Sequence, residues 1–241
     1  MLSALLVFSP VGVGPADAQA VVPFECDGTP YIMQNGRMNR VVPDPANPGE
    51  FLFEEVGAFV GYGNSLGYDP VTNLVYGVRQ PGGVWTVETY DATWGVVNAQ
   101  PIVAAPGSPT YPTGGSNYAG TVLGDGRYIV GTYNTRINGN RDNLWSIDAA
   151  TGLATFIGPI SPQNHRLADF AYNPADGFMY HAVSGNLYQL NPLTGVNLNL
   201  GNIANLTTSG FGSSYFDAAG NLYVHRNSDG TLTQILSLIH I

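Results

Sequence analysis

The chain has 241 residues, of which 44% are hydrophobic, 11% aromatic and only 10% charged, and its formal net charge is −9. This length suits a single domain with a sizeable core. Nucleic-acid binding depends on clustered Lys and Arg, so the net charge of −9 argues against a nucleic-acid partner. All eight basic residues are Arg, and the absence of Lys excludes a Schiff-base lysine.

The first twenty residues have the pattern of an export signal. An apolar run is followed by small residues, either Ala16 and Ala18 or Ala18 and Ala20, as in a secretory signal peptide with its cleavage site. A single membrane anchor is the alternative, but Pro10 and Pro15 interrupt a run that is already too short to span a bilayer. The pattern predicts a signal peptide over residues 1–20, no membrane span in the mature chain, and a secreted or cell-surface protein.

Cys26 is the single cysteine. In an oxidising compartment an odd cysteine is either a free thiol or one half of a disulfide whose other half this sequence lacks. Its place beside strands that lack an inner neighbour favours the disulfide. We expect Cys26 to pair with a cysteine in a closing strand beyond the last complete strand.

A unit of four short strands recurs over residues 24–235. Tyr76, Tyr128 and Tyr180 are each 52 residues apart, and Tyr223 follows 43 residues after Tyr180. A period in the forties built from short strands is typical of the blade of a β-propeller. The longer interval predicts an insertion in one copy.

The turns between these strands have a local chemical reason. In YDPVTNL, YNPADGF and FDAAGNL, an Asp or Asn caps a tight turn, and Gly or Asn takes the left-handed position before the next strand. The flanking segments alternate apolar and polar residues, and no stretch of the mature chain keeps a helical period long enough for a helix. The chain is therefore expected to be all-β.

We expect a β-propeller of five blades, each with four antiparallel strands, truncated before ring closure. TPYIMQ, RMNRVV and FLFEEV supply a second, third and outer strand with no inner strand before them. The last blade stops in its third strand near TLTQIL. The propeller domain spans residues 24–235 and leaves two sheet edges open, which a closing strand would pair.

The last six residues, LSLIHI at 236–241, break this strand-turn pattern. They match the translation of a transposase end used in sequencing libraries, so we interpret them as sequencing-adapter read-through. A genuine apolar terminal strand is the alternative. In the first interpretation the gene continues past residue 235.

The loops that lead into the inner strands ring one mouth of the central channel, where propellers usually bind ligands. The polar candidates for ligand binding in these loops are Asn64, Ser65, Asn117, His165, Arg166 and Asp169. His165, Arg166 and Asp169 come from one blade and could bind an anion or serve acid-base work. The alternative is that His165 is a loop residue bonded to backbone. We assign no catalytic residue.

Metal and cofactor sites are not expected. His181 and His225 fall on adjacent positions of equivalent strands, so alternation aims them at opposite faces of their sheets. Turn carboxylates such as Asp148 and Asp176 lack the dense oxygen-ligand spacing of a calcium loop. The glycines of GDG and PGG precede no helix that could hold a phosphate.

The aromatic residues form two groups. The tyrosines at blade-equivalent positions are expected to pack between blades: Tyr68, Tyr76, Tyr172, Tyr180, Tyr188 and Tyr223. Trp94, Tyr111 and Tyr118 lie outside the repeat or in the insertion at 98–117. They are candidates for an exposed sugar- or protein-binding surface, and packing against a neighbouring blade is equally open.

Four segments, PFECDGTPYIMQ, NSLGYDPVTNLVYGV, LADFAYNPADGFMYHAVSGNLYQLNPLTG and SSYFDAAGNLYVHRN, occur in this order. They resemble the bacterial secreted family called domain of unknown function 6923, over about residues 24–235. The resemblance implies a propeller-like domain of large exported or surface proteins, often ahead of repeated adhesin-type modules. It also implies a further strand-turn unit and a segment with a cysteine for Cys26. It implies no activity.

We therefore interpret the chain as a non-catalytic, secreted or cell-surface propeller that mediates adhesion or recognition within a larger protein. Its partner is an unidentified protein or carbohydrate surface, and further extracellular modules are expected to follow. The alternative is a propeller enzyme, a hydrolase or lyase, with its site at the channel mouth.

Overall fold

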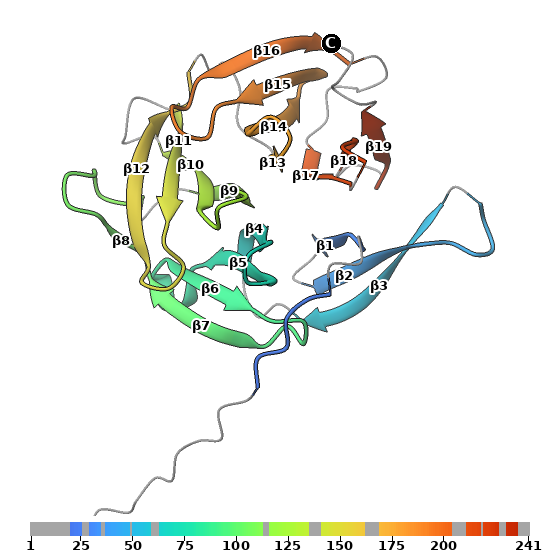
Figure 1. The fold of residues 1–241 in the computed structure, drawn as a ribbon, viewed down its shortest axis with the longest axis horizontal. Coiled ribbons are helices and arrows are strands. Elements are labelled where there is room, and N and C mark those ends of the chain that lie inside the picture. Colours follow the sequence, from blue (N-terminus) through green and yellow to red (C-terminus); the bar gives the residue numbers. More distant parts are fainter. Residues whose placement is uncertain are drawn as a thin grey trace, which may run out of the picture.

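The computed structural model describes residues 20–25, 29–34, 37–48, 50–58, 63–112, 116–134, 141–161, 169–203, 211–217, 219–226 and 230–235. These residues form five small sheets that follow one another around a common axis, as Figure 1 shows. The arrangement is a five-bladed β-propeller, which confirms the predicted all-β fold and blade number.

The first two blades differ in strand number. The described strands of blade 1 are β1 (Tyr31–Gln34), β2 (Arg37–Pro43) and β3 (Phe51–Ala58). Blade 2 is a four-stranded meander of β4 (Gly63–Asp69), β5 (Leu74–Arg79), β6 (Thr86–Tyr90) and β7 (Val96–Pro101). A short 3₁₀ turn, η1 (Pro81–Gly83), lies between β5 and β6.

Blades 3 and 4 are complete, and blade 5 again has three described strands. Blade 3 consists of β9 (Ser116–Val122), β10 (Tyr128–Asn134), β11 (Arg141–Ile147) and β12 (Leu153–Pro159). Blade 4 consists of β13 (Ala171–Asn173), β14 (Phe178–Val183), β15 (Asn186–Leu190) and β16 (Asn197–Asn202). Blade 5 consists of β17 (Phe211–Phe216), β18 (Leu222–Arg226) and β19 (Leu232–Ile235). No helix in these parts of the chain is long and apolar enough to cross a membrane.

A shift in the hydrogen-bonding register separates the third from the outer strand in four blades, and blades 2 and 3 have a further shift between their first and second strands. In the complete blades it lies between the third and the outer strand, at Thr89/Tyr90, Leu144/Trp145 and Leu187/Tyr188. In blade 1 the corresponding shift, at Met38/Asn39, lies between β2 and β3. The strand β2 is therefore equivalent to a third strand and β1 to a second strand, as the sequence predicts. No inner strand of blade 1 occurs among the described residues.

The core consists of side chains packed between neighbouring blades. Trp145 and Tyr128, both with 0% of their surface exposed, lie between blades 2 and 3. Phe170 and Met179 lie between blades 3 and 4, and Leu222 lies between blades 4 and 5. Fully burying a large apolar side chain contributes about 1.5–3 kcal/mol, so these interfaces hold the ring together.

Tyr128 departs from the repeat that its spacing predicts. Tyr76 and Tyr180 each face the blade that follows their own, but Tyr128 faces blade 2, the blade before. The turn that precedes Tyr128 is one residue shorter than the turns that precede the other two. Because side chains alternate along a strand, this change moves Tyr128 to the opposite face, where its ring meets Tyr76 edge to face at 5.7 Å.

The insertion between blades 2 and 3 adds one short strand to the ring. This strand, β8 (Val103–Ala104), pairs in parallel with β12. The segment after it brings Tyr111 into the core between blades 2 and 3, where its ring lies 5.0 Å from that of Trp145. The insertion therefore covers the outer part of blade 3.

Candidate functional site

Ser65 lies in β4, the inner strand of blade 2, and joins this blade to the next. It is buried, with 1% of its surface exposed, and its backbone takes a left-handed conformation with a φ of 61°. Its carbonyl oxygen accepts a hydrogen bond from the hydroxyl of Tyr128 in blade 3. The neighbouring Asn64 pairs through its backbone with Val78 of β5.

Gly120 occupies the point where the inner strands of blades 2 and 3 meet. A Cβ atom on Gly120 would lie 2.0 Å from the carbonyl oxygen of Ser65. No side chain fits at that distance, so the two strands approach each other backbone to backbone. This close approach sets the position of Ser65 near the axis.

Asp169 precedes β13, the inner strand of blade 4, and its carboxylate contacts three blades. Oδ1 accepts a hydrogen bond from the backbone N–H of Phe170 at 2.9 Å, and Oδ2 accepts one from Ser214 of blade 5 at 3.2 Å. The backbone N–H of Gly120 in blade 3 also donates to this carboxylate. Part of the residue stays exposed, but the surrounding strands enclose the carboxyl group.

The electrostatics of Asp169 follow from this enclosure. Removal from water raises the pKa of Asp169 to about 7, although the three backbone donors act in the opposite direction. The carboxyl group therefore titrates near neutral pH at the place where the inner strands of blades 3, 4 and 5 converge. A group that titrates there is suited to proton transfer if a substrate can reach it.

Asn117 lies in β9, the inner strand of blade 3, and is turned toward the insertion. It is buried, and its Oδ1 accepts a hydrogen bond of 2.6 Å from the hydroxyl of Tyr111. Burial raises the pKa of Tyr111 well above its ordinary value, so the hydroxyl remains a donor. Asn117 thus anchors the inserted segment to the inner strand.

The six candidate residues are only partly brought together. Ser65 and Asp169 both touch Gly120, whereas Asn117 bonds to Tyr111. His165 and Arg166 lie outside the described residues, as do Cys26, residues 1–19 and residues 236–241. Ligand binding by the six residues stays a prediction, and the polar groups described above all form bonds that join parts of the ring.

A buried ionic cluster in blade 2 has no signature in the sequence pattern. Glu88, with 4% of its surface exposed, lies 3.0 Å from Nε of Arg79 and accepts a hydrogen bond from the hydroxyl of Tyr90. Tyr90 packs in the cluster between blades 1 and 2 that includes Phe24. Removing either Arg79 or Glu88 would leave a buried charge uncompensated, so loss of one partner is expected to destabilise this part of blade 2.

The described histidines have separate surroundings. Nε2 of the buried His181 lies 3.1 Å from Oδ1 of Asn197, and its ring stacks on Tyr188. His225 meets the ring of Phe53 in blade 1. In the part of the chain that the structure covers, no three His, Cys, Asp or Glu side chains are grouped so as to hold a metal ion.

Two of the aromatic residues outside the repeat pack against neighbouring side chains and do not form an exposed binding surface. Tyr111 keeps 4% of its surface exposed. Trp94 is half-buried, and its ring lies 5.1 Å from Phe24 and 5.9 Å from Tyr31. For these two residues, packing against a neighbouring blade is the alternative that the structure shows. The side chain of Tyr118 is not among those that the structure describes.

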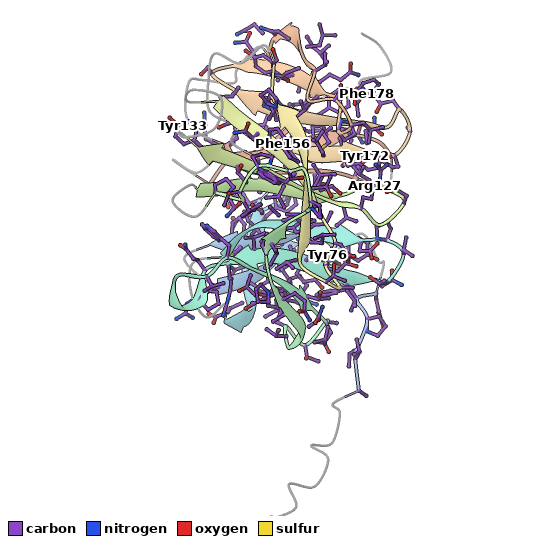
Figure 2. The ribbon with its side chains drawn as sticks, turned by 90° about the vertical axis from the view of Figure 1, so that its left-hand side faces the viewer. Tyr76, Arg127, Tyr133, Phe156, Tyr172 and Phe178 are labelled. Carbon is purple, nitrogen blue, oxygen red and sulfur yellow. The ribbon has the colours of Figure 1, made fainter. Side chains whose placement is uncertain are left out.

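A groove that the sequence analysis missed lies on what we call the turn face, the side of the ring formed by the turns that join first to second strands and third to fourth strands. Between blades 3 and 4 it encloses about 380 Å³. The residues that line it include Leu123, Asp125, Arg127, Tyr172, Asp176, Phe178, Asn191, Pro192 and Leu193. Figure 2 shows Arg127, Tyr172 and Phe178 on one side of the ring and Tyr133 on the opposite side.

The groove has walls from separate blades, which explains why it was missed. Asp125 and Arg127 belong to the turn before β10, whereas Phe178 begins β14 and Leu193 belongs to the turn before β16. These turns are far apart in sequence, and only blade packing makes them neighbours. The sequence contained one signal, because Leu193 is an apolar residue within a turn motif. In the structure 55% of its surface is exposed.

Comparison with known proteins adds a family and a fold. A family model described as a repeat of unknown function (DUF6923) matches residues 31–236. None of the curated proteins matches the sequence.

Several solved structures are similar to this chain to different degrees. A chain of the nidogen/laminin complex has a TM-score of 0.51 and 9% identity, over 85% of this chain and 88% of that chain. TolB from Acinetobacter baumannii has a TM-score of 0.42 and 14% identity, over 89% of this chain and 48% of its own. Hydrazine synthase from Kuenenia stuttgartiensis has a TM-score of 0.48 and 14% identity, over 82% of this chain and 64% of its own. The chain thus spans about half the length of TolB. The likeness to the nidogen/laminin complex shows the fold alone.

Proposed function

The chain belongs to the family of the DUF6923 repeat, and from this premise we propose that it is a non-catalytic propeller that a larger secreted or cell-surface protein uses for adhesion or recognition. The observation that supports this best is the engagement of Asp169. Its carboxylate oxygens accept hydrogen bonds from backbone N–H groups of three blades. A general acid or base needs an oxygen directed at the substrate, whereas this carboxylate is directed at the inner strands.

The rest of the ring suits a binding module. Its polar turn residues hold their own turns, as when Asp217 accepts hydrogen bonds from Ala219 and Asn221. A ring fixed in this way presents its turn face without rearrangement, which favours binding because little ordering is needed. The groove between blades 3 and 4 offers a recognition surface, and the channel-mouth residues around Asp169 offer a second.

The proposal extends to the processing of the chain. Residues 1–20 are removed on export, and the propeller over 24–235 closes with a strand that follows residue 235. Cys26 pairs with a cysteine near that strand. Residues 236–241 are adapter sequence in this proposal, and further extracellular modules follow the propeller. Among the described residues, β1 and β19 are edge strands of their sheets. In this proposal each of these edges pairs with chain that follows residue 235.

One observation favours a second candidate function. A pKa of about 7 for Asp169 would suit a general acid or base at the channel mouth, as a hydrolase or lyase requires. His165 and Arg166 would then be its expected companions in the sequence. This alternative predicts turnover that depends on these side chains.

The two functions are separated by testing the full chain for both. Binding to glycan and extracellular-protein arrays is measured beside glycosidase, lactonase and lyase assays, with His165→Ala and Asp169→Asn as variants. We expect saturable binding and no turnover. Turnover that either variant abolishes would overturn the recognition proposal and establish the enzyme.

A further inference from the structure

The turn face of the ring is strongly acidic. The carboxylates in its described turns are Asp44, Glu50, Asp69, Asp91, Asp125, Asp148, Asp176 and Asp217. Arg127 is the basic residue of these described turns, and its Nη2 lies 2.7 Å from Oδ2 of Asp125. The ends of the strands on the opposite face carry the described arginines Arg37, Arg79 and Arg226. Among the described residues, the turn face is therefore the more negatively charged of the two, although Arg37 and Arg79 on the opposite face are ion-paired with Glu55 and Glu88.

Three carboxylates of the turn face are held in their charged form by neighbouring side chains. The guanidinium of Arg127 lowers the pKa of Asp125, and the side-chain amide of Asn221 lowers that of Asp217. The amide of Asn47 likewise lowers the pKa of Asp44. Hydrogen bonds to the charged form stabilise it. The negative charge of these three carboxylates therefore persists well below neutral pH.

The groove between blades 3 and 4 combines this charge with an apolar floor. Tyr172 and Phe178 are half-buried, and Leu193 has 55% of its surface exposed. Gly124 lies beside Tyr172, and a Cβ atom on Gly124 would meet the edge of that ring at 3.8 Å. Since glycine has no side chain, the edge of the Tyr172 ring stays uncovered from this direction. Aromatic faces and edges of this kind accept both apolar side chains and cations.

Asp176 holds a fixed carboxylate at the rim of this floor. Its Oδ2 accepts a hydrogen bond of 2.6 Å from the hydroxyl of Tyr180, and its Oδ1 accepts one of 3.0 Å from the backbone N–H of Phe178. These bonds place a negative charge beside the groove before any ligand arrives. Because the carboxylate is already ordered, an ion pair with a ligand requires little further loss of side-chain entropy.

We propose that this groove binds an extended cationic peptide segment of a partner protein. The proposal rests on the recognition function stated above and specifies its partner. Apolar side chains of the peptide lie against Tyr172, Phe178 and Leu193, and Lys or Arg side chains lie beside Asp176 and the acidic turns around it. Charge complementarity favours a cationic ligand. The acidic turn face repels anions, and a neutral ligand would gain no electrostatic attraction from it.

Arg127 opposes this binding in part, which provides a test in both directions. Its guanidinium bonds to Asp125 through Nε at 2.8 Å and so neutralises one carboxylate of the rim. Removing the guanidinium would free that carboxylate for the peptide. Arg127→Gln should therefore strengthen binding of a cationic peptide, and Asp176→Asn should weaken it.

The experiment measures fluorescence polarisation of the full chain with three labelled octapeptides. The first alternates Lys with Leu, and in the other two Gln or Glu replaces each Lys. We expect the Lys peptide to bind at least about tenfold more tightly than the Gln peptide, since several ion pairs act together. Raising NaCl from low to physiological concentration should weaken this binding, because the charges are exposed.

Matched variants locate the site on the ring. Asp176→Asn is expected to lower the affinity for the Lys peptide by up to about fivefold, and Arg127→Gln to raise it by a similar factor. These sizes are what exposed ion pairs contribute. Asp217→Asn is the control for charge, because Asp217 caps the corresponding turn of blade 5 outside the groove. Leu193→Ser tests the apolar floor, with Leu198→Ser on the outer strand β16 as its control. Far-UV circular dichroism checks the fold of each variant.

The outcomes separate this inference from the function on which it rests. Equal binding of the Lys and Gln peptides, or equal weakening by Asp217→Asn and Asp176→Asn, would overturn the groove proposal. Binding to glycans without binding to the Lys peptide would also overturn it, but would leave the recognition function in place. Turnover of a substrate by the full chain would instead contradict the recognition function.

Discussion

Blade 3 and the outer strand of blade 1 contain similar apolar residues but bury them to different degrees. Leu144 and Trp145 of β11 have 0% of their surface exposed. Phe51, Leu52 and Phe53 of β3 keep 44%, 41% and 41%. The side chains of β11 lie between two neighbouring blades, whereas β3 lies at the periphery of the ring (Figure 1). Burial of these apolar residues therefore depends on whether other sheets lie on both sides of their strand.

The contacts of two aromatic rings illustrate the difference. Trp145 lies 5.0 Å from each of the rings of Tyr111 and Phe156, and its Nε1 donates a hydrogen bond of 3.1 Å to Thr132. The ring of Phe53 contacts the ring of His225 edge to face, with 6.2 Å between the two ring centres. The same kind of residue therefore contributes to stability in blade 3 and to an exposed surface in blade 1.

Trp145→Ala should have the largest effect and tests the buried side of this comparison. Truncating a fully buried tryptophan leaves a cavity between blades 2 and 3, so the free energy of unfolding should fall by about 3–5 kcal/mol. Urea denaturation followed by far-UV circular dichroism measures it. A fall below about 1 kcal/mol would mean that the interface can collapse around the missing ring.

Gly120→Ala tests how closely the inner strands approach each other. The new methyl group would lie 2.0 Å from the Ser65 carbonyl oxygen and 2.4 Å from its carbon, and both belong to the backbone. Overpacking of this kind destabilises by about 1–3 kcal/mol, and we expect the upper end. The control is Gly124→Ala, whose nearest contact would be 3.8 Å. If the two variants are equally stable in urea, the strands do not meet as described.

Asp169→Asn tests the carboxylate at the convergence of three blades by its pH dependence. In the folded chain its pKa is about 7, and in the unfolded chain it is about 4. The folded state therefore holds a proton between these values that the unfolded state releases. The wild-type free energy of unfolding should fall as pH rises from about 4 to about 7, by up to about 4 kcal/mol relative to the variant, because one pKa unit corresponds to about 1.4 kcal/mol, and then level off.

Urea denaturation of both proteins at several values of pH checks this prediction. The free energy of unfolding of the wild type minus that of Asp169→Asn should fall between about pH 4 and about pH 7 and stay constant at higher pH. Parallel pH profiles would show that Asp169 has an ordinary pKa, and they would also remove the observation that favours the enzyme alternative.

Phe53→Ala should have the smallest effect and tests the exposed side of the comparison. Because 41% of Phe53 is already exposed, its removal should lower the free energy of unfolding by about 1 kcal/mol or less. The same urea experiment as for Trp145→Ala measures it. A loss as large as that of Trp145→Ala would mean that β3 is covered in solution.

Local chemistry explains which features were predictable from sequence. Asp69 accepts hydrogen bonds from the backbone of Val71 and from the hydroxyl of Thr72, both within its own turn. Asn173 accepts a hydrogen bond from the backbone N–H of Ala175 and donates one from its side-chain amide to the carboxylate of Asp176, again within one turn. These bonds join residues a few positions apart, so the sequence motif contains all of their partners. Strand alternation is equally local, and it identified the blades and their order.

The candidate site was predictable only as a region. The sequence placed Ser65, Asn117 and Asp169 before or within inner strands, and the structure finds them there. It did not reveal that Gly120 lies between Ser65 and Asp169, or that Tyr111 takes the side chain of Asn117. Those partners come from other blades or from the insertion, which no repeat pattern describes.

The sequence by itself determined the strands, the turns and the five-fold repetition, because their hydrogen bonds close within a few residues of the chain. Tertiary structure alone decided that Asp169 meets three blades and that turns of blades 3 and 4 enclose a groove. Each of these depends on how one sheet packs against the next. Packing joins residues far apart along the chain, and the register and turn length that control it vary by single residues.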